Sequence, residues 1–322
     1  PQGVVIRLSG LRHEARTLEG TFVPSAKGGT VTIPDFEHVI TEDDVYTLTA
    51  IITDRAGNVT EKTITFSVNR FGSNFYFNDQ TKAHLKRYYE KESFPLVIYE
   101  TNVNAIVDRD IIVYRNGETM RLDKKDFVVE DLSEKDDWMK YRYTVDESVF
   151  SEEGVYEVLV SSIDEAGNRQ DNKTKDTPAS FIIDKTAPSA VITGAEDGGI
   201  YNSTQRTVMV EVTDNYAVGS AEVLVDGEVY GRYDADSLRE LDGKISVELK
   251  QSSSWQRVTA AVTDAAGNEG KAKDMVVLVT TDPLTRLVNS ASFRAMVLGI
   301  LLAIIMLMIL FLIWKRRKDE KE

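Results

Sequence analysis

The chain contains no cysteine and only three histidines, His13, His38 and His84, among its 322 residues. Without cysteine there is no disulfide, no thiol nucleophile and no sulfur ligand for zinc, and so few histidines leave little room for histidine-based catalysis. Basic residues are also in the minority, because 38 Lys and Arg stand against 52 Asp and Glu, giving a net charge of −14. An acidic surface disfavours nucleic acid as a partner. We therefore expect neither an enzyme nor a nucleic-acid-binding protein.

One long apolar run is present near the C-terminal end. It covers Ala295–Trp314, which is twenty residues without a charge. At about 1.5 Å per residue, such a helix crosses a hydrocarbon core roughly 30 Å thick. Four basic residues follow at 315–318, so the positive-inside rule places the tail 315–322 in the cytoplasm and the preceding part outside the cell. The sequence predicts a single-pass protein of the cell membrane, with the lipid bilayer as the partner of Ala295–Trp314.

A five-residue motif occurs three times, as DRAGN at 54–58, DEAGN at 164–168 and DAAGN at 264–268. The copies begin 110 and 100 residues apart, which is the length of one β-sandwich domain. Alternating apolar and polar residues precede each copy, as is typical of a half-buried strand. Gly and Asn tolerate the positive φ of tight turns. Each motif is therefore predicted to end a strand and to form a hairpin turn.

Further strands are indicated upstream of each motif. An apolar run that ends in a turn dipeptide lies at 6–10, 113–117 and 223–227, and in the third copy the runs 190–193 and 207–212 come before it. The third copy then has seven short strands, which indicates an immunoglobulin-like sandwich. The predicted fold class is all-β, with tandem immunoglobulin-like β-sandwiches followed by a single transmembrane α-helix. The first sandwich is incomplete by two strands, so we expect the natural chain to extend N-terminally.

These landmarks divide the chain into six parts. They are a partial Ig-like domain (1–69), an Ig-like domain with a short helical insertion (70–184), an Ig-like domain (185–280), a stalk (281–294), the transmembrane helix (295–314) and the basic tail (315–322). The insertion is predicted at 78–89, because Leu85, Tyr88 and Tyr89 have helical spacing after an Asn/Asp start. The helix either covers an open end of the sandwich or carries a partner-binding patch of two tyrosines.

Three aromatic residues are assigned to the domain cores. Tyr46 and Tyr156 each stand eight residues before the Asp of the motif, where a tyrosine corner places a hydroxyl against the preceding loop. The third domain has Gln256 at this position, with Trp255 beside it. We expect Trp255 to fill the corresponding part of the core.

The repeated hairpin and two linkers resemble the tandem bacterial Ig-like domains of Gram-positive cell-surface proteins. The linkers are Asp184-Lys185-Thr186-Ala187-Pro188 and Asn69-Arg70-Phe71-Gly72-Ser73. The resemblance covers residues 1–280 and implies an extracellular, repeat-built protein of the cell envelope without catalytic activity. Such modules act mainly as spacers or as parts of adhesins. Residues 281–286 lack the LPxTG sorting signal of many such proteins, so the apolar helix is expected to remain as the anchor.

Oxygen-rich residues are predicted to meet at the joints between domains, because the motif hairpin and the loop after the second strand lie at the N-terminal end of an Ig-like domain. The set of the third domain is Asp184, Asp214, Asn215, Asp264 and Asn268, and that of the second is Glu100, Asn102, Asn104, Asp164 and Asn168. Carboxylate and amide oxygens suit Ca²⁺. The same residue types also form turns by accepting hydrogen bonds from nearby backbone N–H groups. Both interpretations stay open, and no other cofactor is expected.

The predicted function is a non-catalytic cell-surface stalk or spacer that is anchored in the membrane and presents an N-terminal region. An alternative is an adhesin or protein-binding module whose partner is a surface protein or glycan; clustered exposed apolar side chains would favour it. A second alternative is the membrane-proximal part of a surface glycan-acting enzyme.

Overall fold

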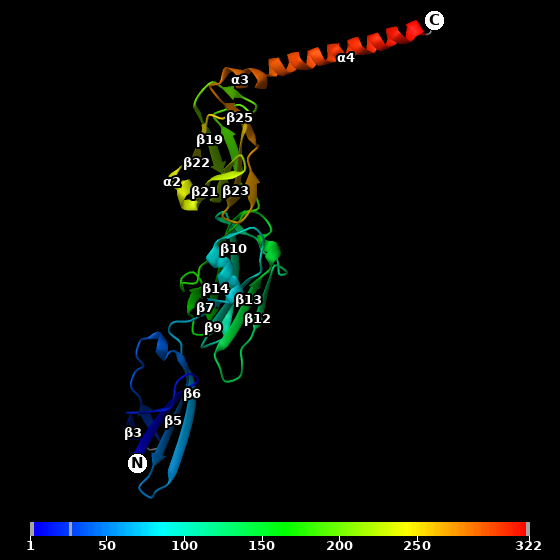
Figure 1. The fold of residues 1–322 in the computed structure, drawn as a ribbon. Helices are drawn as coiled ribbons and strands as arrows, with labels where there is room; N and C mark the ends of the chain where they lie inside the picture. Colours follow the sequence, from blue (N-terminus) through cyan, green and yellow to red (C-terminus); the bar gives the residue numbers. More distant parts are fainter. Residues whose placement is uncertain (1–2, 26–27, 320–322) are drawn as a thin grey trace. The chain divides into compact units, whose positions relative to one another are not determined.

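The chain folds mostly into antiparallel β-sheets, with few helices. The computed structural model describes residues 3–25 and 28–319 (Figure 1). It contains two compact units, Pro1–Asp184 and Lys185–Glu322, and each is considered by itself. The first unit holds two sandwiches. The second holds one sandwich and the C-terminal helices.

The first sandwich has one four-stranded sheet and one two-stranded sheet among its described residues. The larger sheet has the order β2 (Arg16–Leu18), β1 (Gly3–Gly10), β5 (Asp44–Thr53) and β6 (Val59–Val68), and the smaller one pairs β3 (Thr21–Ser25) with β4 (Gly28–Thr32). A 3-10 turn, η1 (Ile40–Glu42), comes before β5. Ile6, Leu8, Tyr46 and Ala50 alternate along β1 and β5 and are buried. They form the covered part of a small core.

The second sandwich is closed by two full sheets. One has the order β12 (Phe127–Asp131), β13 (Met139–Val145), β9 (Leu96–Asn102) and β7 (Asn74–Phe77), and the other has the order β11 (Glu118–Met120), β10 (Ile106–Arg115), β14 (Gly154–Asp164), β16 (Ala179–Ile183) and β8 (Tyr89–Glu90). β15 (Arg169–Asp171) also pairs with β14, β8 runs parallel to β16, and η2 (Glu147–Phe150) precedes β14. In the core, Tyr156 and Phe181 stack, and Phe150 contacts both rings edge to face.

The predicted helix of the second domain is confirmed. α1 (Asp79–Arg87) begins after Asn78, whose side-chain oxygen accepts a hydrogen bond from Thr81 N at 2.8 Å. Such an N-cap satisfies one of the backbone donors that have no partner inside the helix. Leu85 packs against the core of the sandwich, and Tyr88 after the helix is 39% exposed. The helix thus covers part of the core.

The third sandwich repeats this arrangement in the second unit. One sheet has the order β17 (Ser189–Thr193), β19 (Gln205–Thr213) and β22 (Lys244–Lys250). The other has the order β18 (Ile200–Tyr201), β25 (Met275–Val279), β23 (Gln256–Asp264), β20 (Val218–Val225) and β21 (Glu228–Asp234). In addition, β24 (Glu269–Lys271) pairs with β23, and α2 (Ala235–Glu240) follows β21. The hairpin between β20 and β21 turns at Asp226 and Gly227, whose φ values are 55° and 86°. Positive φ at both central residues is the geometry of a tight hairpin turn that matches strand twist.

Two helices follow the third sandwich. α3 (Pro283–Asn289) is capped by Asp282, which accepts a hydrogen bond from Thr285 N at 2.8 Å. α4 (Ala291–Asp319) contains the predicted span, and its part Ala291–Trp314 is long and apolar enough to cross a membrane and is unburied along its length. The predicted basic tail reaches residues 320–322, which lie outside the described residues.

Trp255 corrects one sequence-based expectation. It is only partly buried and lies outside the core of the third sandwich. Its Nε1 donates to Asn289 Oδ1 at 3.0 Å, and Arg294 Nη2 donates to the same oxygen at 2.9 Å. An indole N–H that is withdrawn from water needs a hydrogen-bond partner, and here that partner belongs to α3. Trp255 therefore attaches α3 to the sandwich instead of filling the core.

The two tyrosine corners are confirmed. Tyr46 donates its hydroxyl to Glu42 O at 3.0 Å, and Tyr156 donates to Glu152 O at 2.8 Å. These contacts, with the paired sheets and the order of the strands, establish tandem immunoglobulin-like β-sandwiches followed by one long apolar helix. The finer domain boundaries stay predictions.

Candidate functional site

The three motif hairpins share one hydrogen-bond pattern. One carboxylate oxygen of the Asp accepts from the backbone N–H of the Asn, and the other accepts from its side-chain amide. The paired distances are 2.9 and 2.8 Å for Asp54–Asn58, 2.9 and 3.0 Å for Asp164–Asn168, and 2.8 and 2.8 Å for Asp264–Asn268. The glycine between them takes positive φ, 87° at Gly167. The turn-forming interpretation of these residues is confirmed.

The joint between the first and second sandwiches is built around the side-chain amide of Asn69. Asn69 Nδ2 donates to Asn102 Oδ1 at 2.9 Å, to Asn104 Oδ1 at 2.9 Å and to Asp164 Oδ2 at 2.8 Å. Asn168 Nδ2 donates back to Asn69 O at 3.0 Å. Three oxygens thus converge on one positively polarised NH₂ group, as they would on a small cation. The group that satisfies these three oxygens is therefore an amide of the chain itself, Asn69 Nδ2.

Asp164 is the only charged member of this cluster and is 2% exposed. Burial acts to raise its pKa, but hydrogen bonds from Asn168, Asn102 and Asn69 outweigh burial and hold the pKa below its ordinary value. Donors that point at a carboxylate stabilise its charged form. Asp164 therefore holds the joint as an anion.

Glu100, which the sequence places with this set, points elsewhere. It is fully buried and accepts hydrogen bonds from the hydroxyls of Ser73, Ser162 and Tyr143. Burial, together with the adjacent Glu100 carboxylate, raises the pKa of Tyr143, so this hydroxyl stays protonated and donates. The predicted set of the second domain is therefore split: Asn102, Asn104, Asp164 and Asn168 gather at the joint, and Glu100 does not.

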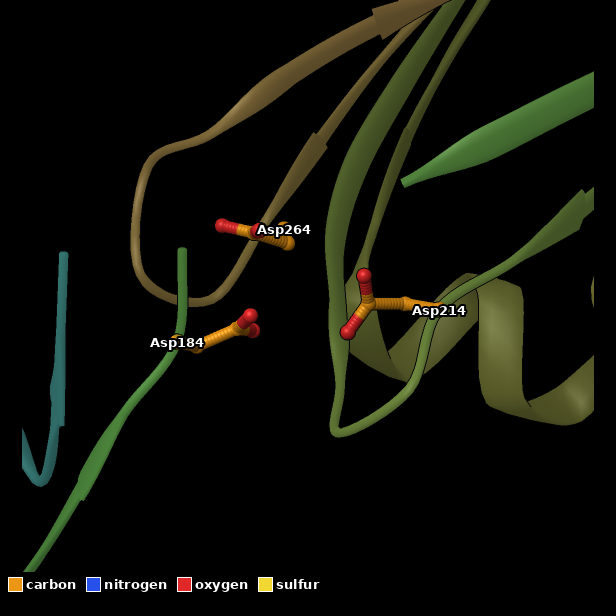
Figure 2. Close-up of side chains that lie close together, drawn as sticks. All are labelled: Asp184, Asp214 and Asp264. Atoms are coloured by element: carbon orange, nitrogen blue, oxygen red, sulfur yellow. The ribbon is translucent and has the colours of Figure 1, made fainter. Parts of the chain in front are cut away.

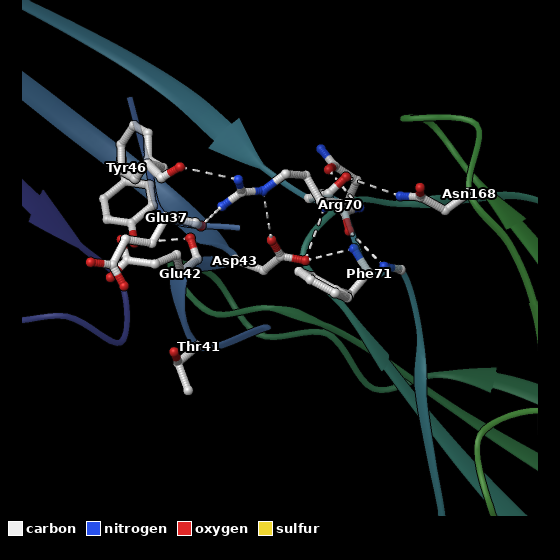
Figure 3. A network of polar contacts seen from close by, with 12 residues as sticks. Glu37, Thr41, Glu42, Asp43, Tyr46, Arg70, Phe71 and Asn168 are labelled. Atoms are coloured by element: carbon white, nitrogen blue, oxygen red, sulfur yellow. Dashed lines mark hydrogen bonds and ion pairs between the residues drawn. The ribbon is translucent and has the colours of Figure 1, made fainter. Parts of the chain in front are cut away.

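Asp43 fixes the linker that follows β6. It is 3% exposed, and its Oδ2 accepts from Arg70 N at 2.9 Å and from Phe71 N at 2.8 Å (Figure 3). Arg70 Nε lies 3.7 Å from Asp43 Oδ1, and the guanidinium also donates to the carbonyl oxygens of Phe36 and Glu37. The linker residues Arg70 and Phe71 are thereby bound to the first sandwich by both backbone and side chain.

Asp44 links the first sandwich to the second. Its buried carboxylate accepts from Arg12 N at 2.8 Å, contacts His13 Nδ1 at 2.7 Å and accepts from Trp138 Nε1 of the second sandwich at 2.8 Å. Burial acts to raise the pKa of Asp44, but the hydrogen bonds from His13 and Trp138 and from backbone N–H groups hold the pKa below its ordinary value. The Arg12 guanidinium lies 3.9 Å from the centre of the Trp138 ring, a favourable cation–π contact.

These contacts of Asp43, Asp44 and Trp138 were not predicted. Asp43 and Asp44 stand at the start of an ordinary strand, and Trp138 lies in a charged loop. The partners are 94 residues apart in the case of Trp138 and Asp44. In the sequence, the only sign of these contacts is Trp138, a single aromatic residue next to an acidic run.

The predicted set of the third domain is placed as follows. Asp214 Oδ1 accepts from Tyr216 N at 2.9 Å and from Ala217 N at 2.8 Å, and Asn215 is exposed in the same turn. Asp264 and Asn268 are 4% and 3% exposed, and an oxygen of Asp264 lies within 4.8 Å of one of Asp214. Asp184 is the buried last residue of the first unit. Figure 2 draws its carboxylate with those of Asp214 and Asp264.

The two predicted sets occupy equivalent places in the sequence. Asn69 follows β6 as Asp184 follows β16, and Asn102 stands three residues before Ala105 as Asp214 stands three before Ala217. Ala105 O and Ala217 O accept the same kind of hydrogen bond from the motif hairpin, at 3.0 and 2.9 Å. By this correspondence in sequence, the predicted set of the third domain carries carboxylates where the second carries two amides. Calcium binding there stays a prediction.

No known family model and no curated protein matches the chain. Solved structures that are similar to it include a tetra-tandem repeat in the extending region of a large adhesion protein (TM-score 0.30, 16% identity, 85% of this chain and 66% of that chain). Others are the full ectodomain of mouse nectin-like molecule 4 (0.35, 11%, 85% and 90%) and the fibronectin(III)-like modules of Clostridium thermocellum CbhA (0.26, 14%, 60% and 88%). Because these similarities are low, the fold assignment rests on the strand topology of the chain itself.

Proposed function

We propose that the chain is a non-catalytic spacer of the cell surface, which holds what lies beyond its first sandwich away from a membrane. The observation that carries the proposal is the joint between the first and second sandwiches. Asn69, Asp43 and Asp44 make partly buried hydrogen bonds that join the first sandwich or the linker to neighbouring residues: Asn69 to Asp164, Asp43 to Phe71, and Asp44 to Trp138. A linker held in this way resists bending, which is what a spacer requires.

The polar residues at this joint also support a non-catalytic role. Asp164, Asp43 and Asp44 are directed at N–H donors that hold the joint. A general acid or base needs access to a substrate and a pKa near the working pH, whereas the pKa values of Asp44 and Asp164 are lowered. These carboxylates are suited to structure and not to proton transfer.

The anchor of the proposed spacer is α4, with the sandwiches outside the cell and the tail inside. The length of Ala291–Trp314 and its lack of burial support a membrane span. The Trp255–Asn289–Arg294 contacts support close attachment of the third sandwich to the start of this helix. A short connection that is bound to the sandwich would hold the third sandwich close to the membrane anchor.

The proposal is tested by the distance of each sandwich from a bilayer. Because the chain has no cysteine, Arg55→Cys in the first sandwich and Ser253→Cys in the third each give one dye site on an exposed residue. The full chain is reconstituted in vesicles with acceptor dye in the lipid. We expect strong energy transfer from position 253 and little from position 55, since one ten-residue strand alone spans about 33 Å. Equal, strong transfer from both positions would overturn the spacer.

A further inference from the structure

The short helix α3 turns its apolar side chains away from the rest of the protein. Leu284, Leu287 and Val288 stand at positions i, i+3 and i+4, so they share one face of the helix. These residues are 67%, 52% and 41% exposed. Leu301 and Leu302, in the middle of the apolar run of α4, are exposed to a similar degree, 51% and 59%. The apolar face of α3 is therefore as open as the predicted membrane span.

The other side of α3 is polar and lies against the third sandwich. Asn289 accepts the hydrogen bond from the Trp255 indole, and its own Nδ2 donates to Thr285 O at 2.9 Å. Just before the helix, Thr281 Oγ1 donates to Gln251 Oε1 at 3.0 Å. Polar groups thus bind α3 to the sandwich, and none of the residues of this helix is buried.

This arrangement is the reverse of that in α2, the other short helix of the same unit. The apolar Leu238 of α2 is 3% exposed and belongs to the core of the third sandwich, whereas Asp236, Arg239 and Glu240 are exposed. A helix on a protein surface ordinarily packs its apolar face inward and turns its polar face to water. Because α3 does the opposite, its apolar face needs a cover that the sandwich does not provide.

Arg294 marks the level of the membrane surface. It is the only charged residue between Arg286 and Lys315. A charge is costly in hydrocarbon, so an arginine near the end of a span reaches toward the interface. Arg294 Nη2 donates to Asn289 Oδ1, and its guanidinium lies 5.8 Å from the centre of the Trp255 ring. Since α3 ends at Asn289, a bilayer crossed by α4 has its surface at the C-terminal end of α3.

Ser290 allows α3 to run in a different direction from α4. Its backbone is extended, with φ −67° and ψ 145°, so the two helices are not continuous. Its hydroxyl group serves both helix ends, because Oγ donates to Leu287 O at 2.7 Å and accepts from Phe293 N at 3.3 Å. A span that crosses the bilayer therefore does not oblige α3 to stand upright above it.

We propose that α3 lies along the surface of the bilayer, with Leu284, Leu287 and Val288 inserted among the upper acyl chains. The cover of the apolar face is the lipid of the membrane that α4 crosses. Because α4 already holds α3 at the surface, its insertion is intramolecular, and three apolar side chains suffice where a free helix of this length would not bind. This inference rests on the membrane anchor of the proposed function. It adds a second membrane contact, which limits tilting of the third sandwich.

Lipid suits this face better than a protein partner does. Its three residues carry no hydrogen-bonding side chain, and the N-terminal end of α3 already has its cap in Asp282. Lipid tails offer no hydrogen bonds, and this face requires none. The face is also continuous in the chain with the span, because Ala291 begins three residues after Val288. The same bilayer can therefore cover both.

The test measures the depth of single dyes on the full chain in phosphatidylcholine vesicles. The chain has no cysteine, so Leu287→Cys, Thr285→Cys and Leu301→Cys each give one labelling site. Lipids with bromine near the headgroup quench shallow dyes, and lipids with bromine near the end of the acyl chain quench deep ones. We expect shallow bromine to quench the dye at position 287 roughly threefold more than the dye at position 285, which lies on the other side of α3. Deep bromine should quench the dye at position 301.

Paired substitutions identify the apolar face as the cause. In the Leu287→Cys chain, Leu284→Gln with Val288→Gln should reduce shallow quenching to the level of the control dye, since glutamine keeps the helix but removes the apolar contact. The matched control is Val191→Gln with Val229→Gln. These valines are 52% and 49% exposed in β17 and β21 of the same unit. Their replacement should leave the quenching unchanged.

Four outcomes overturn the inference, and they separate it from the anchor. Deep quenching at position 301 without shallow quenching at position 287, or equal quenching at 285 and 287, would reject the inserted helix and leave the anchor intact. A lack of quenching at position 301 would reject the anchor and the inserted helix together. If position 287 is shielded only at high protein-to-lipid ratios, where Leu287→Cys forms a disulfide-linked dimer, the cover is a second copy of the chain.

Discussion

A single atom, Asn69 Nδ2, decides how the oxygen cluster of the first joint is satisfied. It donates to Asn102, Asn104 and Asp164, so the negative ends of three groups meet one positive end. If a carboxylate stood at position 69, the cluster would hold two negative charges and lose its central donor. Oxygen-lined sites of that kind bind divalent cations. The choice between amide and acid at one position therefore separates a self-sufficient joint from one that needs a metal.

Asn69→Asp should open the first joint and make its closure depend on calcium. In the presence of chelator we expect the closed joint to lose about 2 kcal/mol of stability, because a partly buried donor is replaced by a second negative charge. That loss is roughly a thirtyfold larger open fraction, and it is measured as trypsin cleavage after Arg70 in the full chain. Millimolar Ca²⁺ should restore slow cleavage. Asn69→Ala is the matched control, and it should open the joint with no response to Ca²⁺; equal responses of both variants would refute the argument.

The first joint should also be sensitive to acid. The pKa values of Asp44 and Asp164 are lower in the folded chain than in the unfolded chain, where Asp titrates near 3.9. Their contribution is therefore complete above about pH 4 and is lost as the pH falls through the folded pKa values. The fluorescence of Trp138, which donates to Asp44, reports the loss of this contribution once Trp255 and Trp314 are replaced by Phe. Its emission should shift only below about pH 4, and a shift that is already complete above about pH 5 would contradict this account.

At the scale of elements, local patterns predict most of the strands and α1. Period-two alternation predicts β5, β14 and β23, and an Asn followed by helical spacing predicts α1 and its cap. Hairpin turns are equally local, because Asp and Asn in the motif bond their own backbone. The two-residue strands β8 and β18 have no such pattern, since they exist only through pairing with β16 and β25.

Contacts between distant residues account for the misses at the candidate site. The sequence correctly groups Asn102, Asn104, Asp164 and Asn168, because their strands end at one side of the sandwich. It wrongly adds Glu100, whose side chain points into the core toward Tyr143. The roles of Asn69 and Trp138 depend on partners more than 30 and 90 residues away. Periodicity carries no information on such pairs.

Trp255 offers a test of how α3 is held. Trp255→Phe keeps the ring and removes the N–H that donates to Asn289. A net loss of about 1 kcal/mol is expected for one hydrogen bond, so the amides of α3 should exchange roughly fivefold faster in the full chain. Trp138→Phe is the matched control, since its donor serves Asp44 in the other unit. Equal acceleration of α3 in both variants would show that the indole N–H does not hold this helix.

At the scale of the whole molecule, the two sets of residues predicted to lie at the joints differ in charge. The residues equivalent to Asn69 and Asn102 are Asp184 and Asp214, so the second predicted set carries carboxylates where the first carries amides. Asp214 has one buried oxygen, Oδ2, that accepts no hydrogen bond among the described residues. The two joints are therefore expected to respond differently to the same metal concentration.

Calcium should stabilise the chain through the predicted set of the third domain. A ligand at 100 times its Kd adds about 2.7 kcal/mol to the folded state, so we expect the melting temperature of the third sandwich to rise in millimolar Ca²⁺ relative to chelator. Asp214→Asn should remove this rise in melting temperature, because it removes a carboxylate of the predicted site. The turn should persist, since the remaining oxygen can still accept from Tyr216 N. Asp54→Asn, in an exposed copy of the motif, should leave the rise intact. A melting temperature that is the same with Ca²⁺ and with chelator would exclude the site.

The parallel strands at the two ends of a sandwich set how the chain responds to tension. β8 lies near the start of the second sandwich and β16 ends it, and Ile182 N and Asp184 N donate to Tyr88 O and Glu90 O between them at 2.7 and 2.9 Å. Pulling the ends apart slides these strands past each other, so their hydrogen bonds share the load in shear. β18 and β25 give the third sandwich the same clamp. Because the hydrogen bonds of each clamp must break together, the second and third sandwiches are expected to resist extension until the clamp fails.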